Sequence, residues 1–177
     1  MAILDILIWP HPSLAKVAPP VCEITAEHEQ LAIDMLDTMY GARGIGLAAT
    51  QVNRMVRMVV IDLNPAPDEE PDEVRDPDFG PFVLINPEIF DRDGTLVWDE
   101  GCLSVPGETG EVERSESVVV RFTDLQGQAR EIKASELLAV CLQHEIDHLD
   151  GIVFPERVAP DRQRAIRRSM RALKATG

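Results

Sequence analysis

Apolar residues recur at helical spacing in two long segments of the chain. In the first, Leu31, Met35 and Met39 form a stripe, and Thr25 is suited to cap a helix that runs to about Tyr40. In the second, residues 135–150, apolar side chains cover most of the surface of one predicted helix. Ser135 is a plausible N-cap, and Gly151 suits the left-handed residue that follows a helix. The second helix is therefore expected to be buried.

Shorter apolar runs between these helices predict β-strands. Strands are expected at 55–63 and 82–85, with a turn at 86–87, and at a segment ending at Trp98. Residues 118–122 and 129–134 form a predicted hairpin that leads into the second helix. The pattern predicts an α+β fold with a single domain, in which a central helix is surrounded by antiparallel or mixed β-sheets.

Residues 65–80 interrupt this pattern. They contain five prolines or glycines, and seven carboxylates lie between Asp68 and Asp78. A segment of this composition buries too little apolar surface to order itself, so we expect a mobile, acidic surface insertion. A divalent-ion site is the alternative, but a run of like charges is more often simply solvated.

The central helix carries the strongest chemical signal. His144 and His148 are four residues apart and therefore project from one face of a helix, as two ligands of one metal ion must. Glu145 lies beside them and can hold a water molecule without binding the metal itself. A solvated polar patch is the alternative, but ionisable groups on a buried helix are costly unless they are paired or metal-bound. The pattern favours a metal-dependent hydrolase.

A catalytic metal held by two histidines needs a third protein ligand. Cys102 lies on a loop that can bring its sulfur to the helix, whereas Cys141 lies one turn before His144 on the helix itself. Three ligands so close on one helix would be strained, which favours Cys102, but the spacing alone leaves both cysteines open.

Composition narrows the class of protein. The 177 residues fit one domain, and the net charge of −14 makes the body a poor ligand for DNA. Three cysteines without paired spacing fit a reducing compartment, and the N-terminus lacks the basic region of a signal peptide. No apolar run is long enough to span a membrane. We therefore expect a cytoplasmic protein, with a monomer as the default.

Three motifs together resemble the peptide deformylase family. They are Gly44-Ile-Gly-Leu-Ala-Ala-Thr-Gln51, Glu100-Gly-Cys-Leu-Ser104 and Gln143-His-Glu-Ile-Asp-His148. The resemblance runs to about Val158, which implies a catalytic domain over residues 1–158 and a basic C-terminal helix or tail over 159–177. It also implies the activity, which is removal of the formyl group from N-formylmethionyl chains with release of formate.

The resemblance assigns a role to each matching residue. Cys102, His144 and His148 would bind the metal, typically Fe²⁺, for which Ni²⁺, Co²⁺ or Zn²⁺ can substitute. Glu145 would be the general base. The Gln51 amide and the Leu103 N–H would hold the oxyanion, and Arg114 would clamp Glu100. Ile45, Gly46 and Gly101 would hold the peptide backbone. Val140 and Cys141 would line the methionine pocket together with His144.

Two features depart from, or add to, the common pattern of the family. Thr109 stands where many bacterial members carry Arg or Tyr, which bears on affinity for the peptide downstream of methionine. The C-terminal segment after Pro160 carries six basic residues. Some bacterial members dock on the ribosome through such a helix, so the resemblance suggests a ribosome contact here.

Two other functions compete with this interpretation. A zinc endopeptidase also uses His-Glu-x-x-His, but Phe154 stands where the longer metzincin pattern has its third histidine. A non-catalytic, ribosome-associated relative would be expected to have lost a ligand or the base. Gln51, Cys102 and Glu145 are all present, which favours the enzyme.

Overall fold

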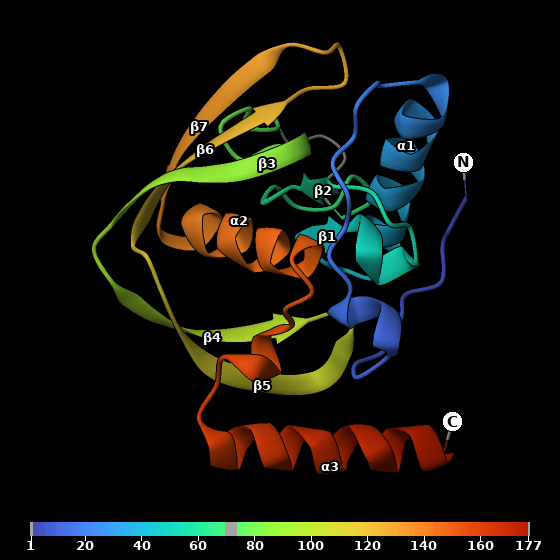
Figure 1. Ribbon diagram of the computed structural model, residues 1–177, viewed down its shortest axis with the longest axis vertical. Helices are drawn as coiled ribbons and strands as arrows, with labels where there is room; N and C mark the ends of the chain where they lie inside the picture. The colour runs from blue at the N-terminus through green and yellow to red at the C-terminus, as the bar shows by residue number, and fades with distance from the viewer. Residues whose placement is uncertain (1, 70–73, 177) are drawn as a thin grey trace.

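The computed structural model describes residues 2–69 and 74–176 and has a helix at its centre. This helix, α2 (Glu136–Leu149), lies between a five-stranded and a two-stranded antiparallel sheet (Figure 1). The α+β fold with a central helix is thus confirmed, and every strand pairing in the described residues is antiparallel. None of the described helices combines the length and apolarity needed to cross a bilayer.

The larger sheet has the strand order β1-β2-β3-β6-β7. Its strands are β1 (Gly46–Ala48), β2 (Met58–Ile61), β3 (Phe82–Asp93), β6 (Ser117–Thr123) and β7 (Ala129–Ser135). The smaller sheet pairs β4 (Leu96–Cys102) with β5 (Val105–Arg114). Three short 3₁₀ segments, η1 (Pro12–Ala15), η2 (Ala49–Val52) and η3 (Phe154–Glu156), connect these elements.

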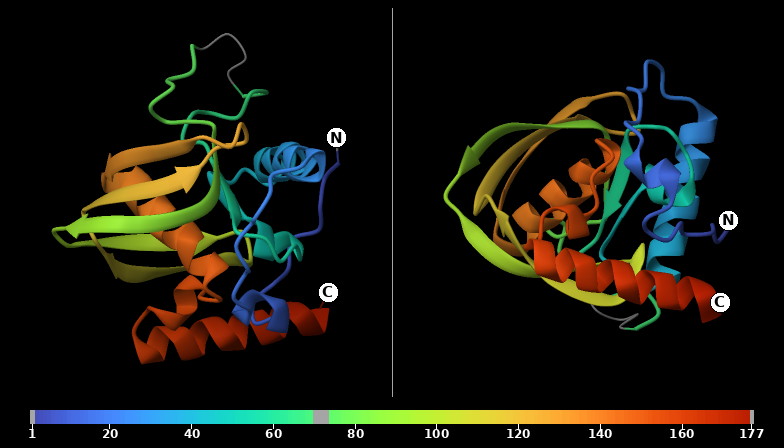
Figure 2. Two further views of the ribbon diagram at one scale, coloured as in Figure 1. Left: turned by 45° about the horizontal axis from the view of Figure 1, so that its top comes forward. Right: turned by 60° about the horizontal axis from the view of Figure 1, so that its bottom comes forward.

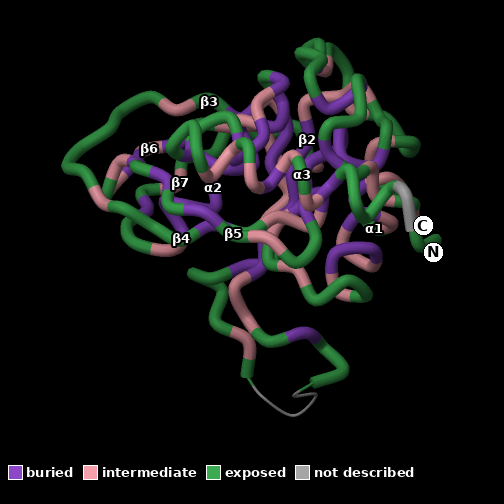
Figure 3. The backbone as a smooth tube through the Cα atoms, turned by 90° about the horizontal axis from the view of Figure 1, so that it is seen from below, coloured by how far each residue is buried: buried purple, intermediate pink, exposed green. Residues whose placement is uncertain are grey.

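The apolar core surrounds α2. Leu142 and Leu149 are fully buried and belong to one apolar cluster with side chains of β2, β3 and β6. Helix α1 (Ala26–Gly41) contributes Met35 and Met39 to a second cluster with β1 and β2. In Figure 3 the buried parts of the chain gather on the central elements, while the connections are mostly exposed. The continuous apolar surface predicted for the second helix reflects this burial.

One local prediction was wrong, and another was confirmed only in part. The turn expected at 86–87 does not form, because β3 continues to Asp93 with a shift in register between Ile85 and Glu88. Asn86 accommodates the shift with a φ of +51°, and its side chain bonds both the N–H and the C=O of Val21. Ser135 occupies the N-cap position of α2, but its side chain makes no capping hydrogen bond.

The described arms of the 65–80 segment project from the body (Figure 2). The Arg43 guanidinium makes two 2.9 Å hydrogen bonds to Asp68. The Asn64 side chain bonds the backbone N–H and C=O of Asp76 across the base of the segment. Both arms are therefore attached to the body, while residues 70–73, on which part of the expected mobility falls, lie outside the described residues.

Helix α3 (Pro160–Thr176) lies along the outside of β5 (Figure 1). Its Ile166 and Met170 are buried in an apolar cluster with Trp9 and Leu14. Arg162 donates hydrogen bonds to the Thr109 carbonyl and the Glu108 carboxylate. The basic helix is therefore packed against the body along one face and exposes the other.

Gly151 provides a stability test of the packing at the end of α2. Its φ is +80°, and a Cβ added there would lie 2.5 Å from the carbonyl oxygen of Ala15. We expect Gly151→Ala to lower the free energy of unfolding by more than about 2 kcal/mol, because a left-handed alanine alone costs about 1–2 kcal/mol and the clash is with backbone.

Gly127 is a matched control for this substitution. It has a φ of +79°, but nothing lies within 4 Å of its added Cβ. Gly127→Ala should therefore lower the free energy of unfolding by only about 1–2 kcal/mol, which measures the cost of the φ angle alone. Equal losses for the two variants in urea unfolding would contradict the close contact at Gly151.

Candidate active site

The site is built on α2, which presents His144, Glu145 and His148 from its buried part. The two histidines are one helical turn apart, so their rings meet on one side of the helix. Their Nε2 atoms are 3.3 Å apart. Because the packing of α2 fixes its backbone, the two imidazoles are held together before any ligand binds.

Cys102 reaches the histidines from the end of β4. The register shifts between Gly101 and Cys102, so that Cys102 pairs with Val105 of β5, and the Cys102 Sγ lies 3.4 Å from His148 Nε2. Donor atoms of Cys102, His144 and His148 all lie within 4.8 Å of one another. Cys141 is not part of this group, so the structure brings Cys102 and not Cys141 to the histidines. The loop expected at Cys102 was wrong, because this residue is the last of β4 and pairs with Val105.

The spacing of these atoms fits a tetrahedral metal site. Two nitrogens each about 2.1 Å from one ion in tetrahedral geometry would be about 3.4 Å apart, close to the observed 3.3 Å. One sulfur and two imidazole nitrogens are a donor set that transition metals use. The three residues therefore fit a bound metal ion, and with three protein ligands a fourth position would remain for water.

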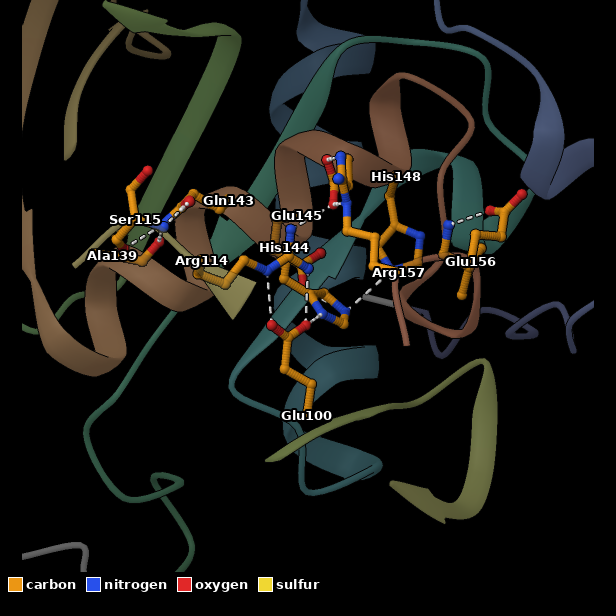
Figure 4. A network of polar contacts seen from close by, with 12 residues as sticks. Glu100, Arg114, Ser115, Ala139, Gln143, His144, Glu145, His148, Glu156 and Arg157 are labelled. Carbon is orange, nitrogen blue, oxygen red and sulfur yellow. Dashed lines mark hydrogen bonds and ion pairs between the residues drawn. The ribbon is translucent and has the colours of Figure 1, made fainter. Parts of the chain in front are cut away.

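Glu100 lies behind His144 and orients it. A Glu100 oxygen is 2.8 Å from His144 Nδ1, and Arg114 binds the same carboxylate through Nε and Nη2 at 2.7 and 2.8 Å (Figure 4). Burial alone would raise the pKa of Glu100, but the hydrogen bonds from Arg114 and His144 lower it to about 2. The charged carboxylate is placed to accept a proton from Nδ1, and a metal at Nε2 of His144 would then take the place of the second ring proton.

Glu145 is in a different electrostatic environment from Glu100. Burial raises the pKa of Glu145 to about 7. Its Oε1 is 3.8 Å from His144 Nε2, and its buried Oε2 has no hydrogen-bond partner in the described structure. A carboxyl group with a pKa near neutrality, next to the donor atoms but outside their group, is suited to accept and return a proton.

The pKa values of the two histidines are shifted in opposite directions. Although burial lowers the pKa of His144, hydrogen bonds to Cys102 and Glu100 raise it well above its usual value. Burial lowers the pKa of His148 well below its usual value. His148 is therefore neutral at physiological pH, the form in which imidazole binds a metal.

Gln51 lies beside the donor atoms on η2. Its side-chain carbonyl accepts the Ala48 N–H at 2.9 Å, which fixes the orientation of the amide. The Nε2 atom then points to Ser104 Oγ at 3.1 Å and Cys102 Sγ at 3.5 Å. A rigid amide donor thus stands next to the proposed metal position.

A cavity of about 690 Å³ opens over Cys102, His144 and Glu145. It is lined by all of the peptide-contact residues expected from the sequence, Ile45, Gly46, Gly101, Val140 and Cys141, together with Leu103, His144 and Glu145. Thr109 lies on its wall as well.

Position 46 on the cavity wall requires a glycine. A Cβ added at Gly46 would lie 2.8 Å from Glu145 Oε1. Only a residue without a side chain lets the strand approach the carboxyl group this closely.

The cavity also includes residues that the sequence did not point to. Trp98 and Arg43 line it, as does Leu137, which lies one turn before Cys141 on α2. The helical spacing of Leu137 and Cys141 could have indicated Leu137, since residues four apart share a face. Trp98 and Arg43 had no such signal, because their positions depend on how β4 and the end of α1 fold over the helix.

Comparisons with known proteins point to one family. The family model for polypeptide deformylase matches residues 3–164. A peptide deformylase of Alkalilimnicola ehrlichii is 47% identical over 177 residues, which cover 100% of this chain and 94% of the relative. The crystal structure of a peptide deformylase from Legionella pneumophila has a TM-score of 0.87 at 39% identity, covering 99% of this chain and 97% of that one. A peptide deformylase from Synechococcus elongatus, solved in complex with actinonin, has a TM-score of 0.81 at 40% identity over 90% and 83% of the two chains.

Proposed function

The chain belongs to the polypeptide deformylase family, and from this premise we propose that Cys102, His144 and His148 hold its catalytic metal. The protein is a metal-dependent hydrolase that removes the N-formyl group from the formylmethionine of newly made polypeptides and releases formate. The observation that carries the site assignment is the convergence of one thiol and two imidazoles, with Glu145 beside them.

The residues around the metal divide the chemical work. A bound ion would activate water and polarise the formyl carbonyl. Glu145 takes a proton from the attacking water and returns it to the departing amine, a role that its raised pKa supports. The Gln51 amide and the Leu103 backbone N–H stabilise the negative charge that develops on the carbonyl oxygen. The fixed orientation of Gln51 supports this role.

The peptide is proposed to bind between two edge strands. In the described sheets β1 pairs only with β2, and β4 pairs only with β5, so both strands have a second edge that a peptide can join. Ile45, Gly46 and Gly101 lie on the cavity wall at these edges. Methionine then fits the apolar surface of Val140 and Cys141 on α2.

For the metal we propose Fe²⁺, with Ni²⁺, Co²⁺ or Zn²⁺ able to substitute. The mixed sulfur and nitrogen donor set supports a first-row transition metal over Mg²⁺ or Ca²⁺, which prefer oxygen ligands. The test is metal analysis of protein purified without oxygen, combined with formate release after reloading with each ion. About one iron per chain and full activity with Fe²⁺ are expected, whereas activity with zinc alone would overturn the assignment to iron.

The ribosome is proposed as a partner through α3, whose exposed side carries Arg168, Arg171 and Lys174. Their spacing of three residues places them on one face, which would attract the phosphates of ribosomal RNA. Since the substrate is a nascent chain, we further propose that the protein acts in the cytoplasm. We also propose that it acts as a monomer. The division into a catalytic domain over 1–158 and this basic helix over 159–177 remains part of the proposal.

Charge reversal tests the ribosome contact better than deletion, because deletion would also remove Ile166 and Met170 from the core. We expect Arg168→Glu with Arg171→Glu to weaken co-sedimentation with ribosomes about 10-fold or more at low salt, with formate release from a dipeptide unchanged. Arg121→Glu, on the exposed side of β6, is the control. Equal binding by all three proteins would remove the proposed partner.

A further inference from the structure

We propose that Asp147, held in place by Arg157, is a positioning residue for the metal ligand His144 and acts on it through Arg114 and Glu100. The inference rests on the metal site proposed above. Five side chains form a continuous series of contacts from the surface to the site. Arg157 binds Asp147, Asp147 binds Arg114, Arg114 binds Glu100, and Glu100 binds His144.

Arg114 is the centre of this series. Its Nε and Nη2 atoms bind Glu100, and its Nη1 atom donates to Asp147 at 2.6 Å. The Arg114 side chain is only 4% exposed, so little solvent competes for these donors. A guanidinium is planar and rigid, so the carboxylate at one end fixes the direction of the donors at the other. Asp147 therefore determines how Arg114 meets Glu100.

Arg157 fixes Asp147 in turn. It follows η3 and binds both carboxylate oxygens of Asp147, with Nε at 2.6 Å and Nη2 at 2.8 Å. The Arg157 side chain is 41% exposed, whereas that of Asp147 is 13% exposed. Arg157 also balances the charge of Asp147, so that Arg114 does not have to serve two carboxylates alone.

The outer pair lies away from the substrate. Asp147, Arg157 and Arg114 line a separate polar cavity of about 300 Å³, and in the described structure none of them lines the substrate cavity. Changes at Asp147 or Arg157 therefore have no direct route to the peptide. In the described side-chain contacts, the connection from these two residues to His144 runs through Arg114 and Glu100.

Metal affinity depends on the hydrogen-bond partners of the ligating histidines as well as on the ligands themselves. A carboxylate that accepts the second N–H of a ligating histidine fixes the ring and raises its basicity, and losing it typically costs about 10–100-fold in metal affinity. Asp147 acts one contact further out than Glu100. We therefore expect Asp147→Asn to release the metal about 10-fold faster than wild type, and Arg157→Ala about threefold faster.

The test uses the full-length protein loaded with Co²⁺. Two quantities are measured: the rate at which a chelator removes the ion, and the visible absorption of the bound cobalt, which reports its ligand geometry. Asp150→Asn is the matched control, since Asp150 ends the same helix and pairs with an arginine, Arg57, at 3.0 Å without contacting Arg114. Circular dichroism confirms folding of each variant.

Arg157→Ala separates positioning from simple charge attraction. Removing a positive charge near a cation should retain the metal longer, so faster release shows that geometry was lost. In the Asp147→Asn background Arg157→Ala should change nothing further, because Arg157 acts through Asp147.

Two outcomes overturn the inference. One is metal release and a cobalt spectrum that are unchanged in Asp147→Asn. The other is slower or unchanged release in Arg157→Ala. Wild type that binds no Co²⁺ would instead contradict the metal site itself.

Discussion

The Glu145→Gln variant is expected to bind its metal as well as wild type and to release formate roughly 10³-fold more slowly, within the range typical for loss of general acid–base catalysis. Glutamine keeps the shape of the side chain but cannot carry the proton. The donor group found in the described structure consists of Cys102, His144 and His148, so metal retention should not depend on residue 145. Formate release and metal content measured on the same samples separate the two roles.

Glu136→Gln is the control for this variant. Glu136 lies on the same helix but is exposed at its first turn, away from the cavity. It should leave both formate release and metal content unchanged. If Glu145→Gln lost its metal together with its activity, Glu145 would be a ligand or a structural support, and the role of general base would be wrong.

Cys102→Ala is expected to lower metal affinity by more than about 100-fold, because losing an outer partner of a ligand already costs about 10–100-fold. Cys102 Sγ lies 3.4 Å from His148 Nε2, in the donor group. Deformylation should fall to the background level at ordinary metal concentrations. Metal titration followed by formate release measures both effects.

Cys141→Ala is the matched comparison, since it removes a thiol from the same neighbourhood. Burial raises the pKa of the Cys141 thiol, which keeps it neutral and disfavours metal binding. We expect Cys141→Ala to keep its metal and to change mainly KM, because Cys141 lines the cavity. If Cys141→Ala lost the metal and Cys102→Ala retained it, Cys141 would be the ligand instead of Cys102.

Most of the helical part of this site could be predicted from the sequence. Helical periodicity alone places His144 and His148 on one face, and the apolar surface around them indicates burial. The proposed third ligand was harder to predict, because Cys102 meets the helix only after the register shift at the end of β4. That shift depends on pairing between strands, which spacing along the chain does not encode, so Cys141 remained a competitor.

The contacts behind the site were not predictable from local pattern. In the sequence, nothing distinguishes Asp147 from other charged residues on a helix, or Arg157 from other surface cations. Only the fold shows that they meet at 2.6 Å and continue through Arg114 to His144. The turn expected at Asn86 failed for a similar reason, because its side chain bonds Val21, 65 residues earlier. At Asn86 a long-range partner overrides the local turn propensity.

The most direct test of the account is product analysis with a short formyl-Met-Ala peptide and protein purified without oxygen. Mass spectrometry of the peptide is combined with a formate assay on the same reaction. We predict a peptide that has lost only its formyl group, with an equal amount of formate. A metal-loaded protein that instead cut an internal peptide bond, or that left the formyl group in place, would contradict the deformylase function.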